Sequence, residues 1–314
     1  MKYGLMKSIT LSLVFCLLAG FTMAAEGNSD PVQSAAQSTE TRKETAEGSP
    51  EATEGGPIMS EQTYSTQEIW VQNGDSKIYG IAYVPDLAEK MPLVIFSHEL
   101  GNDHTSGERY AERLAEAGYA AYVFDFCGGT VGGNKSDGSN SEMSVLTEAS
   151  DLEAVLEASK AWDFADADRI FLLGGSMGGL VTTVVGSGHQ DEIAGMIFMY
   201  PALSAKVDSG AGQYKTEDEV PEDVSLFGGW IHVGKNFVTD LWKVDFNQLL
   251  SSYKGHMLLL HGDKDSTVPI SWSEDASMII PDCEFHVIKN GGHEFFGQPF
   301  EDAMSISCLI WTGS

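Results

Sequence analysis

A serine set between glycines, at the junction of two different apolar runs, constrains this chain more than any other feature. The run 169–173, apolar after Arg169, leads into Gly-Gly-Ser-Met-Gly at 174–178, and residues 177–185 have the composition of a helix. A turn this tight between a strand and a helix strains the backbone at the serine and leaves no room for side chains at the flanking positions. The segment therefore predicts a strand, a sharp turn that exposes the Ser176 hydroxyl, and a helix that begins beneath it.

Strand-like and helix-like runs alternate along most of the chain after residue 62. We expect strands at 67–72, 77–84, 93–96, 119–124, 169–173, 194–199, 256–260 and 284–288. Helices are expected at 108–117, 145–162, 177–185, 271–279 and 299–311. Such alternation is typical of an α/β fold, a mostly parallel, doubly wound sheet with helices on both faces. We therefore predict one domain of this class over residues 63–314.

The interval from about 202 to 252 interrupts this alternation. It is rich in glycine and acidic residues and contains the aromatic residues Phe227, Trp230, Phe237 and Trp242. Several aromatic side chains in a merely solvated loop would be unusual. We interpret the interval as an inserted cap segment that covers a pocket.

The first 62 residues have two compositions, and neither is that of a folded domain. Residues 1–24 combine Lys2 and Lys7 with a short apolar stretch and small residues before Ala25, which is the pattern of a secretory signal peptide. Residues 25–62 are an acidic segment rich in Ser, Thr, Glu, Gly and Pro, which predicts a disordered tether. We expect a secreted, periplasmic or cell-envelope protein without stable membrane insertion after signal cleavage; an uncleaved anchor is the alternative.

The charge balance argues against binding to nucleic acid. Eighteen Lys and Arg stand against 46 Asp and Glu, a formal net charge of −28. Binding to nucleic acid requires clustered cations, so we expect no nucleic-acid partner. Four cysteines, one of them (Cys16) inside the predicted signal peptide, do not define a disulfide framework. The oligomeric state stays open.

A serine hydroxyl becomes a nucleophile only when a base takes its proton, and the base is usually oriented by a carboxylate. Asp265 follows the expected strand 256–260, and His293 follows the expected strand 284–288. Both would lie at the carboxyl edge of the sheet, where open α/β sheets place their sites. The chain order Ser176, Asp265, His293 agrees with a serine hydrolase. Asp263 is the rival acid.

An ester or amide hydrolase also needs N–H donors for the oxyanion that develops in the transition state. The backbone N–H of Met177, directly after the serine, is one candidate. The second donor should come from the loop that follows strand 93–96. His98, His104 and His261 do not have the spacing of known metal ligands, so no metal site is expected.

Seven sequence motifs together resemble one known family. They are Val94-Ile95-Phe96-Ser97-His98, Asp125-Phe126-Cys127-Gly128-Gly129, Met143-Ser144-Val145-Leu146-Thr147-Glu148, Gly174-Gly175-Ser176-Met177-Gly178-Gly179, Tyr200-Pro201-Ala202, His261-Gly262-Asp263-Lys264-Asp265 and Gly291-Gly292-His293. Residues of about 69–311 resemble α/β-hydrolases of the cinnamoyl (feruloyl) esterase type. The resemblance implies an α/β-hydrolase fold and hydrolysis of carboxylic esters through an acyl-enzyme, with no metal or organic cofactor.

The resemblance also implies further site residues. The family places its second oxyanion donor on the residue that corresponds to Leu100. This chain has Glu99 where the family carries glycine, so a carboxylate stands beside the expected oxyanion site. In the cap, an acid after Tyr-Pro-Ala can meet a phenolic hydroxyl of the substrate. Asp208 lies at the matching place, with Gln213 nearby.

We therefore expect a secreted serine carboxylesterase that acts on small acyl or hydroxycinnamoyl esters, free or linked to polysaccharide. His293 would be the base, Asp265 would orient it, and Ser176 would carry the acyl group. A serine aminopeptidase or acylaminoacyl peptidase of the same fold is the alternative. A binding protein with an inactive Ser-His-Asp set is a third.

Overall fold

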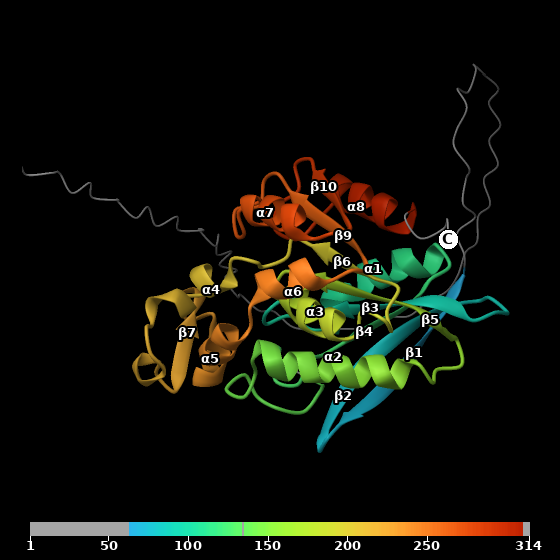
Figure 1. The fold of residues 1–314 in the computed structure, drawn as a ribbon. Coiled ribbons are helices and arrows are strands. Elements are labelled where there is room, and N and C mark those ends of the chain that lie inside the picture. The colour runs from blue at the N-terminus through green and yellow to red at the C-terminus, as the bar shows by residue number, and fades with distance from the viewer. Residues whose placement is uncertain (1–62, 134, 310–314) are drawn as a thin grey trace, which may run out of the picture. The chain divides into compact units, whose positions relative to one another are not determined.

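The computed structural model describes residues 63–133 and 135–309. The predicted signal peptide (1–24) and tether (25–62) lie outside the described residues. An eight-stranded sheet forms the centre, in the order β1-β2-β4-β3-β5-β6-β9-β10 (Figure 1). Its strands are β1 (Tyr64–Asn73), β2 (Ser76–Pro85), β3 (Met91–Ser97), β4 (Ala120–Phe124), β5 (Ala165–Gly175), β6 (Gly195–Met199), β9 (His256–Gly262) and β10 (Cys283–Ile288).

The sheet is parallel from β4 to β10 and antiparallel at its N-terminal edge. Strands β1 and β2 form a hairpin in which Asn73 pairs with Ser76, so that Gly74 and Asp75 make the turn. Gly74 has a φ of 57°, a conformation that glycine adopts without steric cost. Strand β2 also pairs antiparallel with β4, and every pair beyond β4 is parallel. The predicted α/β fold with a mostly parallel sheet is confirmed.

Helices cover both faces of the sheet. They are α1 (His104–Glu116), α2 (Val145–Ser159), α3 (Met177–Gly188), α6 (Phe246–Ser252), α7 (Ser271–Ile279) and α8 (Gln298–Leu309). Helices α1 and α8 pack on one face, and α2, α3, α6 and α7 pack on the other. The run 93–96 is apolar throughout because β3 is covered on both faces. Leu93 and Ile95 enter one core, and Val94 and Phe96 enter the other.

Local signals set the helix starts. The Ser144 hydroxyl accepts from the N–H of Thr147, and the Thr147 hydroxyl accepts from the N–H of Ser144, so a reciprocal capping box begins α2. Asp103 caps α1 by accepting from the N–H of Thr105. The expected helix 108–117 therefore begins earlier, at His104, and the expected helix 145–162 ends at Ser159.

The interval 202–252 forms its own small substructure between β6 and β9, beside the main sheet in Figure 1. It contains α4 (Ala205–Asp208), η1 (Ala211–Gln213), η2 (Glu217–Glu219), β7 (Asp223–Leu226), η3 (Phe227–Gly229), β8 (Ile231–Gly234), α5 (Lys235–Lys243) and α6. Strands β7 and β8 pair only with each other, antiparallel, and η3 joins them. Helix α6 packs on α3 and connects this substructure to the sheet.

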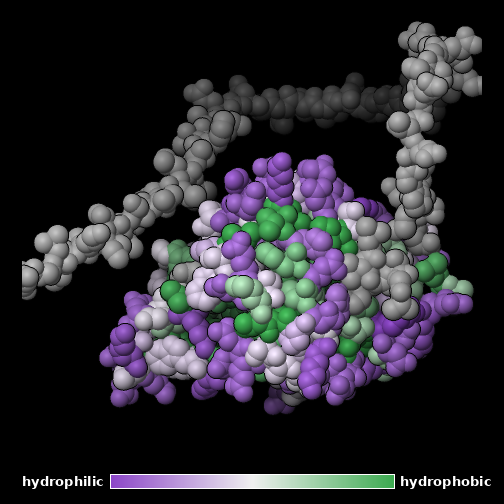
Figure 2. Space-filling model, turned by 45° about the horizontal axis from the view of Figure 1, so that its top comes forward, coloured by the Kyte–Doolittle hydropathy of each residue, from purple (hydrophilic) through white to green (hydrophobic). Residues whose placement is uncertain are grey.

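The surface is mixed in polarity. Figure 2 shows hydrophobic residues gathered in the middle of one face, with hydrophilic residues around them. Within residues 63–133 and 135–309, no helix combines the length and the apolar character needed to span a membrane.

Candidate active site

Ser176 lies at the sharp turn between β5 and α3. Its φ of 48° and ψ of −116° are strained for a residue with a side chain. A Cβ on Gly174 would lie 2.4 Å from the Gly178 carbonyl oxygen, and one on Gly178 would lie 2.1 Å from the Ser97 carbonyl oxygen. The turn therefore requires glycine at both places, as the sequence predicts, because the end of β3 and the start of α3 approach it closely.

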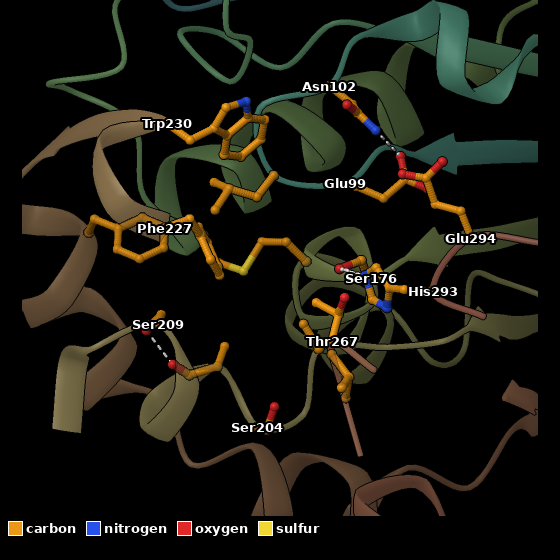
Figure 3. Close-up of a pocket in the computed structure, with 16 residues that line it drawn as sticks. Glu99, Asn102, Ser176, Ser204, Ser209, Phe227, Trp230, Thr267, His293 and Glu294 are labelled. Carbon is orange, nitrogen blue, oxygen red and sulfur yellow. Dashed lines mark hydrogen bonds between the residues drawn. The ribbon is translucent and has the colours of Figure 1, made fainter. Parts of the chain in front are cut away.

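His293 and Asp265 meet Ser176 at the carboxyl edge of the sheet. Asp265 follows β9, and His293 follows β10. His293 Nε2 lies 2.9 Å from Ser176 Oγ, and His293 Nδ1 lies 2.8 Å from Asp265 Oδ2 (Figure 3 shows the serine–histidine contact). A carboxylate can only accept, so Nδ1 carries the proton and Nε2 is left to accept from the serine hydroxyl. The three residues form one continuous hydrogen-bonded chain.

The Asp265 carboxylate has no solvent exposure but is fully engaged. Its Oδ1 accepts from the backbone N–H groups of Thr267 and Val268, each at 2.8 Å. Burial alone would raise the pKa of Asp265. Hydrogen bonds from His261, His293 and the Val268 N–H outweigh burial and hold that pKa well below its usual range. Asp265 therefore stays ionised next to His293.

His261 is a second imidazole on Asp265, and the sequence did not predict this contact. Its Nε2 lies 3.1 Å from Asp265 Oδ2 and 3.0 Å from the Val268 carbonyl oxygen, both acceptors. The proton must therefore be on Nε2. Nδ1 lies 2.7 Å from Ser273 Oγ in α7, which can donate to it. The signal in the sequence was a histidine at the end of a buried strand, four residues before the acid.

Asp263, the rival acid, and the Cys127 thiol lie in different surroundings from Asp265 and Ser176. Asp263 is exposed, and its Oδ1 accepts from the backbone N–H of Asn290, so it joins two loops. The Cys127 thiol, which follows β4, has a pKa raised to about 12 by burial and by the negative charge of Asp151. Cys127 is therefore a thiol and not a thiolate at neutral pH.

The two expected oxyanion donors line the same cavity as Ser176. Met177 is the first residue of α3, whose first N–H groups have no partner within the helix. Leu100 lies in the loop between β3 and α1 and also lines the cavity. Glu99, beside it, is only 5% exposed and directs its carboxylate to Tyr200, Asn102 and Ser106.

The cavity has a volume of about 350 Å³ and an unequal lining. Aromatic side chains of the inserted segment form one end, and two carboxylates lie at the other end, as Figure 3 shows. The residues that line it are Glu99, Leu100, Asn102, Ser176, Met177, Ala202, Ser204, Ala205, Ser209, Phe227, Trp230, Phe237, Thr267, Val268, His293 and Glu294. Burial raises the pKa of Glu294, and the charge of Glu99 raises it further.

Asp208 and Gln213 lie close in sequence to residues that line this cavity. Asp208 ends α4, and Ala205 and Ser209, on either side of it, line the cavity. Gln213 ends η1 and is exposed. Contact of these two residues with a substrate stays a prediction.

Residues that could hold a metal ion lie outside this cavity. Among the described residues, two groups have three potential ligands close together: Asp103, His104 and Asp125, and Glu157, His189 and Glu192. In the first group, His104 Nδ1 already lies 2.6 Å from Asp125 Oδ1 as a buried ion pair. The second group is at the surface and also contacts Lys160.

The sheet order and the sharp turn at Ser176 are those of the α/β-hydrolase fold, and a family model matches part of the sequence. Residues 88–224 match the family model described as serine aminopeptidase, S33. This match covers less than half of the chain, and the predicted α/β-hydrolase fold is confirmed. A search of curated protein sequences found no match.

Solved structures with the same fold include several hydrolases. Est1E from Butyrivibrio proteoclasticus, solved with bound ferulic acid, aligns with a TM-score of 0.67 and 21% identity, over 76% of this chain and 96% of that one. α/β-Hydrolase domain-containing protein 10 from mouse aligns with a TM-score of 0.61 and 20% identity, over 78% and 98%. A monoacylglycerol lipase from Paleococcus ferrophilus aligns with a TM-score of 0.59 and 20% identity, over 74% and 96%.

Proposed function

We propose that the protein is a serine carboxylesterase that acts on small acyl or hydroxycinnamoyl esters. The observation that carries the proposal is the hydrogen-bonded chain from Ser176 through His293 to Asp265, which opens into an aromatic-lined cavity. The ferulic acid complex of Est1E, a protein of the same fold, supports the choice of acyl group.

The proposed reaction follows from the geometry. His293 Nε2 takes the Ser176 proton while Oγ attacks the ester carbonyl carbon, and the carbonyl oxygen becomes an oxyanion held by the N–H groups of Leu100 and Met177. Asp265 stabilises the imidazolium. His293 then returns the proton to the leaving alcohol, and the acyl-enzyme forms. Water, activated by the same histidine, releases the acid and restores the serine.

The test compares wild-type protein with Ser176→Ala on methyl ferulate and p-nitrophenyl butyrate. We expect turnover of both esters by the wild type and a loss of at least about 10³-fold in the variant. A higher kcat/KM for ferulate would support the hydroxycinnamoyl proposal. Turnover that survives in Ser176→Ala would refute the mechanism.

An aminopeptidase or acylaminoacyl peptidase is the second candidate, and two observations favour it. The family model that matches residues 88–224 is that of a serine aminopeptidase, and Glu99 and Glu294 place two carboxylates in the cavity. Carboxylates could hold the ammonium group of a peptide. Aminoacyl p-nitroanilides, offered beside the esters, separate the two: a peptidase would hydrolyse the anilides with the higher kcat/KM.

We further propose that the protein is exported through the signal peptide at 1–24 and carries 25–62 as a tether. The composition of these residues supports this. Expression in a secreting host tests it by the intact mass of the exported protein, which should lack residues 1–24. A full-length chain retained in the membrane fraction would instead favour the uncleaved anchor.

A further inference from the structure

Glu99 departs from the glycine of the family that the sequence resembles, and its carboxylate is held on both oxygens. Oε1 accepts from the Tyr200 hydroxyl at 2.9 Å. Oε2 accepts from Asn102 Nδ2 at 3.0 Å and from Ser106 Oγ at 2.9 Å. Three neutral donors, from the β3–α1 loop, from α1 and from the turn after β6, therefore meet on one side chain. Such a carboxylate connects segments that are far apart in the sequence.

The turn at Ser176 leaves room for this carboxylate. A Cβ on Gly175 would lie 2.6 Å from Glu99 Oε1 and 3.4 Å from the Tyr200 hydroxyl oxygen. A side chain at residue 175 would therefore displace Glu99. Gly175 directly precedes Ser176, so the carboxylate packs against the same turn that presents the nucleophile.

The backbone of Glu99 is fixed as well. Its carbonyl oxygen lies 2.8 Å from His98 Nδ1 and accepts from the backbone N–H of Asn102 at 3.1 Å. His98 Nε2 accepts from the N–H of Phe126, so Nδ1 carries the proton and donates. In a planar trans peptide the carbonyl and the N–H point in opposite directions. Holding the carbonyl of Glu99 therefore also fixes the direction of the N–H of Leu100.

Tyr200 connects Glu99 to the proposed base. The Tyr200 ring meets the His293 ring edge-on, with the centroids 5.0 Å apart, and its backbone has a strained φ of 43°. Its hydroxyl also lies 3.0 Å from the Tyr110 hydroxyl of α1. The position of Tyr200 is therefore set by contacts with Glu99, Tyr110 and His293 together.

We propose that Glu99 is a positioning residue of the hydrolytic site. Its side chain ties the peptide that carries the Leu100 N–H to Tyr200, and through the Tyr200 ring to His293. This inference rests on the proposed serine hydrolase function. It predicts that Glu99 supports the rate of the chemical step and does not bind substrate.

The test measures kcat and KM for p-nitrophenyl butyrate in Glu99→Ala, Glu99→Gly and Glu99→Gln. We expect Ala and Gly to lower kcat about 10- to 100-fold while KM changes less than about 3-fold, because a poorly aimed oxyanion donor loses transition-state stabilisation only. Gln keeps the size but only one of the two acceptor oxygens, so it should recover part of the rate that Ala and Gly lose. Glu112→Gln, at an exposed acid of α1, is the matched control and should leave both constants unchanged.

A double-mutant cycle adds a second test. If Glu99 acts through Tyr200, Glu99→Ala combined with Tyr200→Phe should lose little more kcat than Glu99→Ala alone. Fully additive losses would contradict this connection. Unfolding midpoints of all variants are recorded beside the rates, and a lowered midpoint with unchanged kcat would overturn the proposal in favour of a purely structural role.

Other outcomes overturn the proposal in distinct ways. A faster Glu99→Gly enzyme would mean that the carboxylate hinders the oxyanion. A raised KM confined to aminoacyl anilides in Glu99→Gln would mean that Glu99 binds a substrate ammonium. Reaction with a fluorophosphonate probe distinguishes failure of the proposed serine hydrolase function from failure of the proposed role of Glu99. An unreactive wild type refutes the proposed function, whereas a Glu99→Ala variant that reacts as fast as a reactive wild type refutes only the role of Glu99.

Discussion

At the scale of single residues, the Asp265 carboxylate shows how the site controls charge. Two imidazoles contact the same oxygen, Oδ2, and two backbone N–H groups hold the other. His261 has acceptors on Nε2 and a hydroxyl on Nδ1, so it can donate to Asp265 as a neutral ring. The carboxylate thereby keeps one orientation toward His293.

His261→Phe removes one donor from Asp265 and keeps a ring of similar size. Loss of a hydrogen bond to a charged group costs about 1.5–3 kcal/mol, so we expect kcat to fall about 10- to 100-fold with little change in KM. Steady-state kinetics on p-nitrophenyl butyrate measure this. Ser273→Ala is the matched control: it removes the partner of Nδ1 but leaves the donor to Asp265, and its loss should be several-fold smaller. Equal losses in both variants would contradict this role for His261.

The sequence places Ser176, Asp265 and His293 correctly at the ends of their strands, because chain order and strand ends can be read along the chain. The partners of Glu99 could not be predicted in the same way. Tyr200 and Ser106 reach Glu99 only because β3 and β6 flank β5 and α1 packs beside them, and these relations depend on the strand order. The direction of the Glu99 carboxylate therefore required the fold.

At the scale of elements, two glycines of α3 differ in what surrounds them. A Cβ on Gly178 would lie 2.1 Å from the Ser97 carbonyl oxygen, whereas one on Gly188, at the other end of the helix, would meet nothing within 4 Å. Backbone cannot move aside as a flexible side chain can. The N-terminal glycine is therefore required by packing, and the C-terminal one is not.

Gly178→Ala should therefore disrupt the turn at Ser176 and abolish esterase activity, with a large fall in the unfolding midpoint. Gly188→Ala is the control in the same helix. It should keep activity and raise stability by up to about 1 kcal/mol, because alanine favours helix over glycine. Thermal unfolding and p-nitrophenyl butyrate turnover distinguish them, and an active, stable Gly178→Ala protein would be contrary to the packing argument.

The inserted segment supplies the aromatic end of the cavity. Trp230 is 50% exposed, packs over Gly101 and meets Phe227 at a ring-centroid distance of 6.2 Å. The aromatic residues of the interval 202–252 predicted a cap. The β7–β8 pair, α5 and α6 were not predicted from the sequence. Short strands that pair only with each other, with glycines between them, carry a weak periodic signal.

Trp230→Ala tests this aromatic end. Loss of a large aromatic contact should lower kcat/KM for methyl ferulate about 10-fold or more and lower it much less for p-nitrophenyl acetate. Trp70→Ala, at a tryptophan of β1 that is 51% exposed and does not line the cavity, is the matched control. Equal losses for both esters would argue against an aromatic acyl site at Trp230.

At the scale of the whole molecule, a buried ion pair connects α1 to the turn after β4. His104 Nδ1 lies 2.6 Å from Asp125 Oδ1, and the Asp125 carboxylate also accepts from the N–H groups of His104 and Lys135. Burial alone would lower the pKa of His104, but the contact with Asp125 outweighs burial and raises it. For Asp125, hydrogen bonds from His104 and Lys135 outweigh burial and lower the pKa.

The pKa shifts of His104 and Asp125 limit the pH range in which their ion pair contributes to the free energy of unfolding. The His104 contribution is complete below about pH 6.5 and is lost as the pH rises through its raised folded pKa. The Asp125 contribution is present above about pH 4 and is lost as the pH falls. His104→Gln should therefore lower the free energy of unfolding by about 1.5–3 kcal/mol at pH 5.5 and by less at pH 8.5. Urea unfolding at both pH values checks this.

His189→Gln provides the comparison, because His189 pairs with Glu192 at the surface. Surface pairs contribute about 0–1 kcal/mol, so this variant should stay near the wild type at both pH values. A His104→Gln effect that grows toward pH 8.5 would contradict the assignment of the raised pKa to His104.

The most direct test of the central claim is the mass of the acyl-enzyme. Wild-type protein and Ser176→Ala are mixed briefly with p-nitrophenyl butyrate, quenched in acid, and analysed by intact mass and peptide mapping. We predict one butyryl adduct on the peptide that contains Ser176 in the wild type and none in the variant. An adduct elsewhere, or p-nitrophenol release that is unchanged in Ser176→Ala, would contradict a mechanism that passes through Ser176.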